Sequence, residues 1–167
     1  MVPHFNRRKL LVFLFVVLVG GCMKAPSNLE QTIPKIIFFS TKDFKFYDTG
    51  FIKTYANGDI SLEIFNVGHL LLRFLVFQDR ICINQQCYAK ASAVRQFFGN
   101  DAMRGIDFSE ILQGREIFGG KNKENLKNGY EQKLQIGSSK IVYQVTDKQI
   151  YFKENTSGFT LIVTELN

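Results

Sequence analysis

Residues 130–165, YEQKLQIGSSKIVYQVTDKQIYFKENTSGFTLIVTE, contain four short runs rich in β-branched and aromatic residues. Such runs favour β-strands, and the Gly, Ser, Asp and Asn residues between them favour turns. Connections this short join neighbouring strands only in the antiparallel sense, because a parallel crossover needs a dozen residues or more. The stretch therefore predicts an antiparallel meander with strands at 130–136, 140–146, 149–153 and 159–165.

Five further strands are expected upstream of this meander. Asn57-Gly58 is a strong hairpin signal, because both central residues of a type I′ turn need positive φ. The run from Leu70 to Phe77 is apolar except for Arg73, which predicts a central strand. The five strands are expected at 44–53, 60–65, 70–77, 80–83 and 87–89.

The residues between these two groups of strands change to a helical pattern. Ser92 can cap a helix at residues 93–98. Asp107 and Glu110 have the spacing of a capping box, with Asp107 as the cap of a short helix that Gly114 ends. Two short helices are therefore expected in the middle of the chain.

The polar segment 119–129 is interpreted as a loop. One face of the sheet needs cover, and the central helices are the elements that can supply it. The expected fold class is therefore mainly β with short helices (α+β). We expect a curved antiparallel sheet, or an open half-barrel, wrapped around a central helical insert.

The N-terminus has the pattern of a secretory signal. Three basic residues at 7–9 precede ten apolar residues at 10–19, a run too short for a bilayer, which needs about 20 residues. Val19-Gly20-Gly21-Cys22 resembles the lipobox of bacterial lipoproteins. Small residues there admit the signal peptidase, and the Cys22 thiol is the only nearby group that can form a diacylglyceryl thioether. A plain secretory signal with an incidental cysteine is the alternative.

Cleavage before Cys22 removes 21 of the 167 residues and leaves 146. About three palmitate-type chains on the new terminus make an effectively permanent anchor. Enterobacterial lipoproteins kept in the inner membrane have Asp after the cysteine, whereas this chain has Met23. The outer membrane, on its periplasmic side, is therefore favoured over the inner one. The expected organisation is a signal peptide at 1–21, a lipidated tether at 22–35 and a single β domain at 36–167.

The charge of the chain bears on its partners. The formal net charge of +6 falls to +3 in the mature chain, because Arg7, Arg8 and Lys9 leave with the signal peptide. No dense basic run remains, which argues against nucleic acid as a partner. The expected partner is membrane lipid, reached through acylated Cys22.

Two cysteines remain beyond the anchor. A two-residue turn at 84–85 would place Cys82 opposite Cys87 in a non-hydrogen-bonded cross-strand pair, where side chains lie closest. In an oxidising periplasm this predicts a disulfide. Two buried thiols, or a zinc site completed by His69 and Asp79, are the alternatives.

The chemistry of an enzyme is missing from the pattern. His69 is the only histidine of the mature chain, and it lies in a predicted turn. Neither a paired-carboxylate motif, nor a glycine-rich phosphate loop, nor a nucleophile elbow is present in the sequence. We therefore expect a protein that is not an enzyme and has no catalytic residue, metal or cofactor.

Phenylalanine is the abundant residue. Of the 17 in the chain, three belong to the signal peptide, which leaves 14 in a mature chain without tryptophan. Aromatic side chains can fill an ordinary core or line a cavity that takes acyl chains. Core and cavity walls look alike in sequence, so both interpretations stay open.

Three segments carry a resemblance to a known family. Residues 107–117 resemble the short helix of the LolB and LolA lipoprotein carriers. Gly129–Gln132, leading into Lys140–Tyr143, is similar to their strand pair. The segments 149–152 and 159–163 are similar to their last hairpin. The resemblance extends over about residues 44–166.

LolB-like proteins are outer-membrane lipoproteins with an open, apolar half-barrel covered by helices. They accept acylated lipoproteins from a periplasmic carrier and release them into the membrane. They touch the bilayer with an exposed leucine on a protruding loop, for which Val67–Leu70 is a weak counterpart here. The resemblance implies a ligand-binding concave wall of Phe44, Phe46, Ile60, Leu62, Ile64, Leu72, Phe74 and Val76, with Ile111 and Leu112 on the covering helix.

Two functions follow from these observations. The first is an acyl-chain-binding lipoprotein that acts in lipoprotein localisation. The second is a structural or assembly lipoprotein, for example an immunoglobulin-like sandwich, that binds a protein partner and has a filled core.

Overall fold

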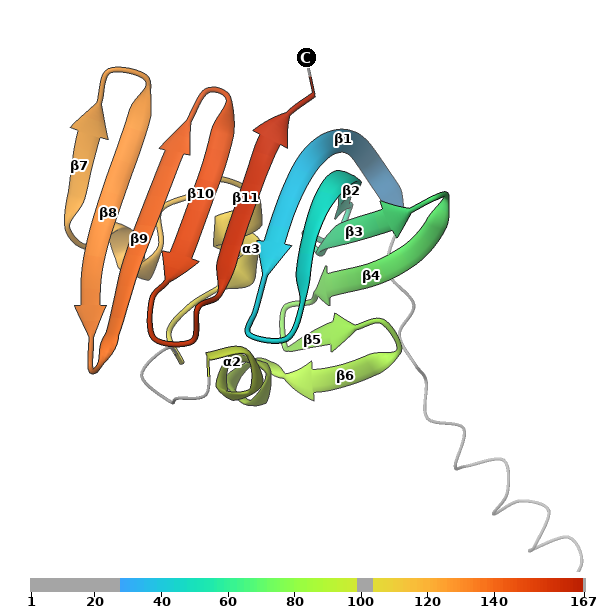
Figure 1. Cartoon of the computed structure of the whole chain (residues 1–167), viewed down its shortest axis with the longest axis horizontal. Helices are drawn as coiled ribbons and strands as arrows, with labels where there is room; N and C mark the ends of the chain where they lie inside the picture. The colour runs from blue at the N-terminus through green and yellow to red at the C-terminus, as the bar shows by residue number, and fades with distance from the viewer. Residues whose placement is uncertain (1–27, 99–103, 167) are drawn as a thin grey trace, which may run out of the picture.

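A computed structural model describes residues 28–98 and 104–166 (Figure 1). These residues form eleven strands, two short α-helices and one 3₁₀ turn. All eleven strands belong to one sheet, and neighbouring strands are antiparallel. The elements are β1 (Leu29–Ser40), β2 (Lys45–Tyr55), β3 (Ile60–Asn66), β4 (His69–Val76), β5 (Arg80–Ile83), β6 (Gln86–Ala89), α2 (Lys90–Phe98), α3 (Phe108–Leu112), η2 (Phe118–Gly120), β7 (Lys123–Leu126), β8 (Gly129–Ile136), β9 (Ser139–Thr146), β10 (Gln149–Glu154) and β11 (Thr160–Glu165).

The sheet is open. Its strand order is β6-β5-β4-β3-β2-β1-β11-β10-β9-β8-β7, so the two groups of strands meet where β1 pairs with β11. Within the described residues the edge strands β6 and β7 do not pair with each other. The predicted fold class, an open antiparallel sheet with a helical insert, is confirmed. The immunoglobulin-like sandwich is wrong, because there is one sheet rather than two.

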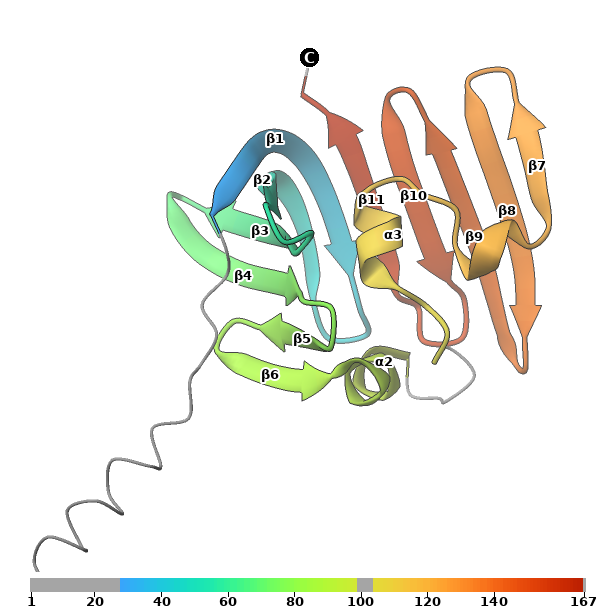
Figure 2. The ribbon, with the colours of Figure 1, turned by 180° about the vertical axis from the view of Figure 1, so that it is seen from behind.

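The helical insert connects the two edges of the sheet. The chain leaves edge strand β6 into α2 and re-enters the sheet at the other edge through β7. It must therefore cross one face, and Figure 2 shows α3 lying across the strands on that side. Because α3 contacts β3 from the first group and β10 from the second, it lies in the hollow between them.

A glycine in β2 allows a core side chain of β1 to pack directly on the backbone. Gly50 lies in the middle of β2, opposite Ile64 of β3. A Cβ at this position would overlap the Cδ1 atom of Ile37 and the carbonyl oxygen of Glu63. Only a residue without a side chain admits Ile37 onto the β2 backbone here.

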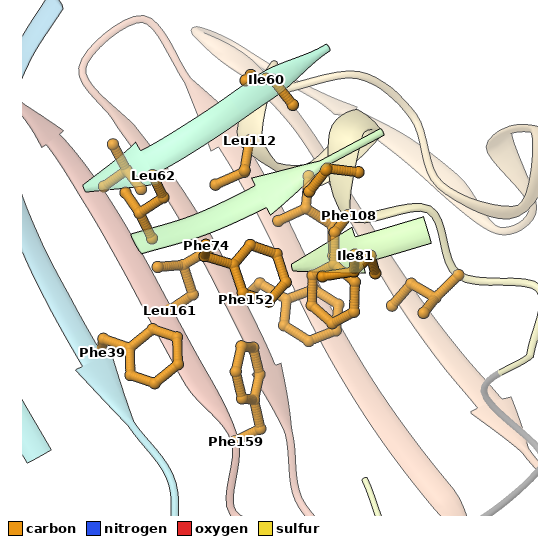
Figure 3. Close-up of a cluster of buried hydrophobic side chains, with 14 of the residues drawn as sticks. Phe39, Ile60, Leu62, Phe74, Ile81, Phe108, Leu112, Phe152, Phe159 and Leu161 are labelled. Atoms are coloured by element: carbon orange, nitrogen blue, oxygen red, sulfur yellow. The ribbon is translucent and has the colours of Figure 1, made fainter. Parts of the chain in front are cut away.

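The hydrophobic core occupies the concave face, and its centre is aromatic (Figure 3). Phe159 is the hub, since its ring lies edge-on to Phe39 at 5.4 Å, Phe152 at 5.8 Å and Phe108 at 6.0 Å. Phe108 in turn meets Phe74 at 5.1 Å. Edge-to-face rings at these distances attract each other beyond the area they bury. They join both groups of strands through α3.

β1 was not predicted, and it changes the boundary expected for the tether. The strand begins at Leu29, so it includes residues 29–35 of that segment. Its first half is mostly exposed and contains Pro34, which argues against a central strand. Pairing with β11 begins only at Lys35. At Pro34, β1 therefore pairs with β2 but not with β11. The missing N–H of the proline costs no hydrogen bond on the side where β11 would lie.

Two other expectations are wrong in detail. The polar segment 119–129, expected as a loop, contains η2 and the edge strand β7. All four β7 residues are exposed, so they show no apolar alternation. The first helix begins at Lys90, three residues earlier than expected, and Ser92 therefore lies inside it rather than capping it.

The cysteine hairpin has the predicted register. Cys82 pairs with Cys87 across the two-residue turn at 84–85, and the two residues form a disulfide with a Cα–Cα distance of 3.9 Å. The zinc site and the pair of free thiols are therefore wrong. Within the described residues, no three His, Cys, Asp or Glu side chains are grouped so as to hold a metal.

Candidate functional site: the concave face

The structure brings all ten predicted ligand-binding residues into one hydrophobic cluster on the concave face. Phe44 and Leu72 are partly buried against this cluster, whereas the other eight are buried. The wall that the resemblance implies thus consists of residues that share one apolar interior, while their binding of a ligand stays a prediction. The eight buried residues are Phe46, Ile60, Leu62, Ile64, Phe74, Val76, Ile111 and Leu112.

Helix α3 fills the centre of the concave face. Its apolar residues Phe108, Ile111 and Leu112 are all buried. Asp107 caps the helix, and its carboxylate accepts a hydrogen bond from the Ser109 N–H at 2.9 Å, as predicted. Burial opposes ionisation of Asp107, but the bonds from Ser109 and from Lys90, at 3.1 Å, hold its pKa below the ordinary value.

The segment after α3 is fastened to β8 and β9 by buried polar side chains. Gln132 is fully buried, and its amide donates to the carbonyl oxygens of Ile117 and Lys121 at 2.9 and 2.8 Å. Its own oxygen accepts from the Ile117 N–H at 2.9 Å. The Tyr143 hydroxyl donates to the Arg115 carbonyl at 2.8 Å, and burial raises the pKa of Tyr143. These contacts were not predicted.

A cavity of about 330 Å³, here named the end cavity, remains beside the C-terminal end of α3. It lies between strands of both groups, and of the ten predicted residues only Ile60 and Leu112 line it. Other apolar residues of its wall are Ile52, Ile150 and Val163. Lys35, Lys148 and Glu165 are among the polar lining residues.

Apolar side chains are also exposed at the β3–β4 hairpin. Val67 lies at its tip with 91% of its surface exposed, and Val67 and Gly68 both have positive φ. Leu70 and Leu71 follow with 42% and 41% exposed, and they border a depression of about 620 Å³ that reaches the β5–β6 turn. This hairpin is an exposed apolar tip of the molecule. His69 lies beside it and is exposed.

A buried ion cluster lies on the opposite face of β3. Glu63 is 1% exposed, and its carboxylate contacts the Lys53 ammonium at 2.6 Å and the Arg73 guanidinium at 2.9 Å. Two cations compensate the buried charge of one acid. Arg73 interrupts the apolar run of β4 for this reason, and the cluster was not predicted from the sequence.

Cys22 lies outside the described residues. Among the residues that are described, no helix is long and apolar enough to cross a membrane. No protein-family model matches the chain, and no characterised protein matches it in a sequence search.

Proposed function

We propose that this protein is an outer-membrane lipoprotein that binds acyl chains on its concave face and acts in lipoprotein localisation, in the manner of LolB-like carriers. The observation that carries the proposal is the end cavity. It opens an apolar space of about 330 Å³ between the sheet and α3, within the range of about 300–1,000 Å³ typical of small-molecule sites.

Two further features support an acyl ligand. The concave wall is formed by aliphatic and aromatic side chains from both groups of strands, which suits an uncharged chain. The insert that covers it is short: α3 has five residues, and its capping interactions and the Gln132 contacts hold it from both sides. The insert therefore forms a fixed wall on one side of the end cavity, which Leu112, Gln113 and Gly114 line.

Two features of the chain, the lipobox and the exposed β3–β4 hairpin, support membrane association. The lipobox at Cys22 predicts the anchor, and the apolar tip at Val67, Leu70 and Leu71 is suited to contact with the acyl boundary of a bilayer. A periplasmic carrier and other acylated lipoproteins are the partners that this function implies. We place the protein on the periplasmic side of the outer membrane.

A second candidate function is favoured by a specific observation. At the centre of the concave face, the Phe108 ring lies edge-on to Phe74 at 5.1 Å and to Phe159 at 6.0 Å, so aromatic side chains from both groups of strands pack against α3 there. A structural or assembly lipoprotein with a packed core would have this centre. Its partner would then bind the outer surface, not the concave face.

Ligand binding separates the two functions. All eleven strands and both described α-helices lie at residue 29 or beyond, so a chain lacking residues 1–22 contains every one of them. A fluorescent fatty-acid probe should bind this chain saturably in the micromolar range, and palmitate should displace it. Leu112→Ala should weaken binding, whereas Leu126→Ala, on exposed β7, is the matched control and should not. Absence of saturable binding would leave the structural function.

The anchor has its own test. Cys22→Ser should abolish lipidation of the exported protein, because serine cannot form the thioether. Mass spectrometry of the protein from the membrane fraction measures the acyl chains. Acyl chains that persist in the variant would contradict the lipoprotein assignment.

A further inference from the structure

Three charged side chains stand at the end cavity, where β1 and β11 finish their pairing. Lys35 of β1 is the register partner of Glu165 of β11, and their side chains form an ion pair. The Glu165 N–H donates to the carbonyl oxygen of Lys148 at 3.0 Å, which brings the β9–β10 turn beside the pair. All three residues line the cavity. The group thus holds two cations and one anion.

The partners of this ion pair differ in burial. Lys35 lies on the same face of β1 as Ile33, which also lines the cavity, and Ile37 of the core. Its side chain is therefore on the concave side, and it is only 13% exposed. The Glu165 side chain is 49% exposed. The mostly covered lysine side chain favours an anionic partner, whereas a half-exposed carboxylate can return to water at little cost. Glu165 is therefore the replaceable member of the pair.

The rest of the cavity is suited to a hydrocarbon chain. Ile52, Ile60, Leu112 and Val163 are buried residues of its wall, and they extend from the charged group toward α3. A volume of about 330 Å³ is at the lower end of ligand sites, which suits a single acyl chain. Charge and hydrocarbon thus meet in a single site.

We propose that the end cavity binds a single-chain amphiphile with an anionic head. The acyl chain lies along Ile60, Leu112 and Val163, and the head takes the place of Glu165 on the Lys35 ammonium, with Lys148 beside it. A fatty-acid carboxylate and a lysophospholipid phosphate share this chemistry. The proposal rests on the acyl-binding function proposed above and adds a ligand class and two head-group residues.

The test compares ligands that differ in the charge of the head. Palmitate, lysophosphatidylglycerol and uncharged monopalmitoylglycerol are titrated into the chain lacking residues 1–22. We expect the charged ligands to bind about tenfold more tightly than the uncharged one, because an ionic hydrogen bond is made only with them. Preference for palmitate assigns a free fatty acid, and preference for the lysophospholipid assigns a lipid head group.

Variants then locate the head group. Lys35→Gln should weaken palmitate binding about tenfold and leave monopalmitoylglycerol unchanged. Glu165→Gln removes the competing carboxylate from a half-exposed position, so it should strengthen palmitate binding, and circular dichroism of the variant checks its fold. Lys127→Gln, on the exposed β7–β8 turn, is the matched control and should change the affinity for neither palmitate nor monopalmitoylglycerol.

The outcomes distinguish the two proposals. Equal affinity for charged and uncharged ligands, with no effect of Lys35→Gln or Glu165→Gln, would overturn the anionic head and leave the acyl-binding function in place. If none of the three ligands binds the unsubstituted chain, the acyl-binding function fails and this inference with it. Circular dichroism of Lys35→Gln identifies a folding defect, in which case Glu165→Gln alone decides.

Discussion

The centre of the concave face and its end cavity are built from the same kinds of side chain, but they are packed differently. In the centre, Phe108 of α3 lies against Phe74 and Phe159 from the two groups of strands. At the end cavity, Leu112 of the same helix faces about 330 Å³ of space. The centre therefore supplies stability, whereas the end offers room for a ligand, and one helix of five residues serves both.

The largest expected effect is in the filled centre. Phe74→Ala removes the ring that packs on Phe108 and leaves a void in a close-packed region, so we expect a loss of about 3–5 kcal/mol in the free energy of unfolding. Urea unfolding of the chain lacking residues 1–22 measures it. The loss should be the same with and without palmitate.

Leu62→Ala, also in the buried cluster, should cost about 2–5 kcal/mol in the free energy of unfolding by the same mechanism.

A small loss at Phe74 would remove the contrast between the two regions. It would mean that the centre is as loosely packed as the end cavity and is available to a ligand.

The second effect concerns the fastening of the segment that covers both regions. Gln132→Leu leaves the buried Ile117 N–H without its acceptor and removes one donor each from the Ile117 and Lys121 carbonyl oxygens, so we expect a loss of about 1–3 kcal/mol. Hydrogen exchange at the Ile117 amide should accelerate. Gln135→Leu, on the exposed side of the same strand, is the control. Unchanged exchange at Ile117 would show that Gln132 does not hold this segment.

The third effect is at the end cavity. Leu112 is buried but borders the end cavity, where neighbouring side chains or water can fill the space that Leu112→Ala leaves, so the loss should be about 2 kcal/mol, smaller than at Phe74. Because palmitate binds at this wall in the proposal, the variant should also gain less stability from added palmitate. A melt with and without palmitate measures both. A loss as large as that of Phe74→Ala would show that the end is packed like the centre.

The sequence predicted the strands of the sheet better than it predicted which part of the concave face is hollow. Strands from β2 to β6 and from β8 to β11 follow alternation and turn residues that depend on local chemistry, and the Cys82–Cys87 pairing follows from a two-residue turn. β7 was missed because it is an exposed edge beside β8 and has no apolar alternation of its own. β1 does contain the apolar run Ile36–Phe39, but its first half is mostly polar and holds Pro34, so the segment was interpreted as the end of a tether.

For the candidate site, the sequence could indicate which residues face the inside of the sheet, but not where a cavity remains. Inward positions could be read from alternation, but filled and hollow parts of that face depend on how α3 crosses it, and core and cavity residues are of the same types. Gln132 left a usable signal, since it occupies an inward position on β8 in line with buried Leu134. A polar residue at such a position indicates a buried hydrogen-bond site. Lys35 gave a similar signal in a strand that was not predicted.

The smallest effect concerns the start of α3, where Asp107 orders the helix that both regions share. Because the pKa of Asp107 is lowered in the folded protein, its charged form contributes stability that is present above the ordinary value of 3.8 and is lost as the pH falls through the lower folded-state value. Asp107→Asn keeps a capping side chain but loses the charge, so we expect a cost of about 0.5 kcal/mol at neutral pH after screening of the partly exposed Lys90 pair. The difference between Asp107→Asn and the unsubstituted chain should shrink toward zero in urea melts below the ordinary value. Asp147→Asn, in the exposed β9–β10 turn, is the control for a general charge effect. A difference that persists unchanged at low pH would show that Asp107 acts through its shape alone, and α3 would then be held by its buried face and by Gln132.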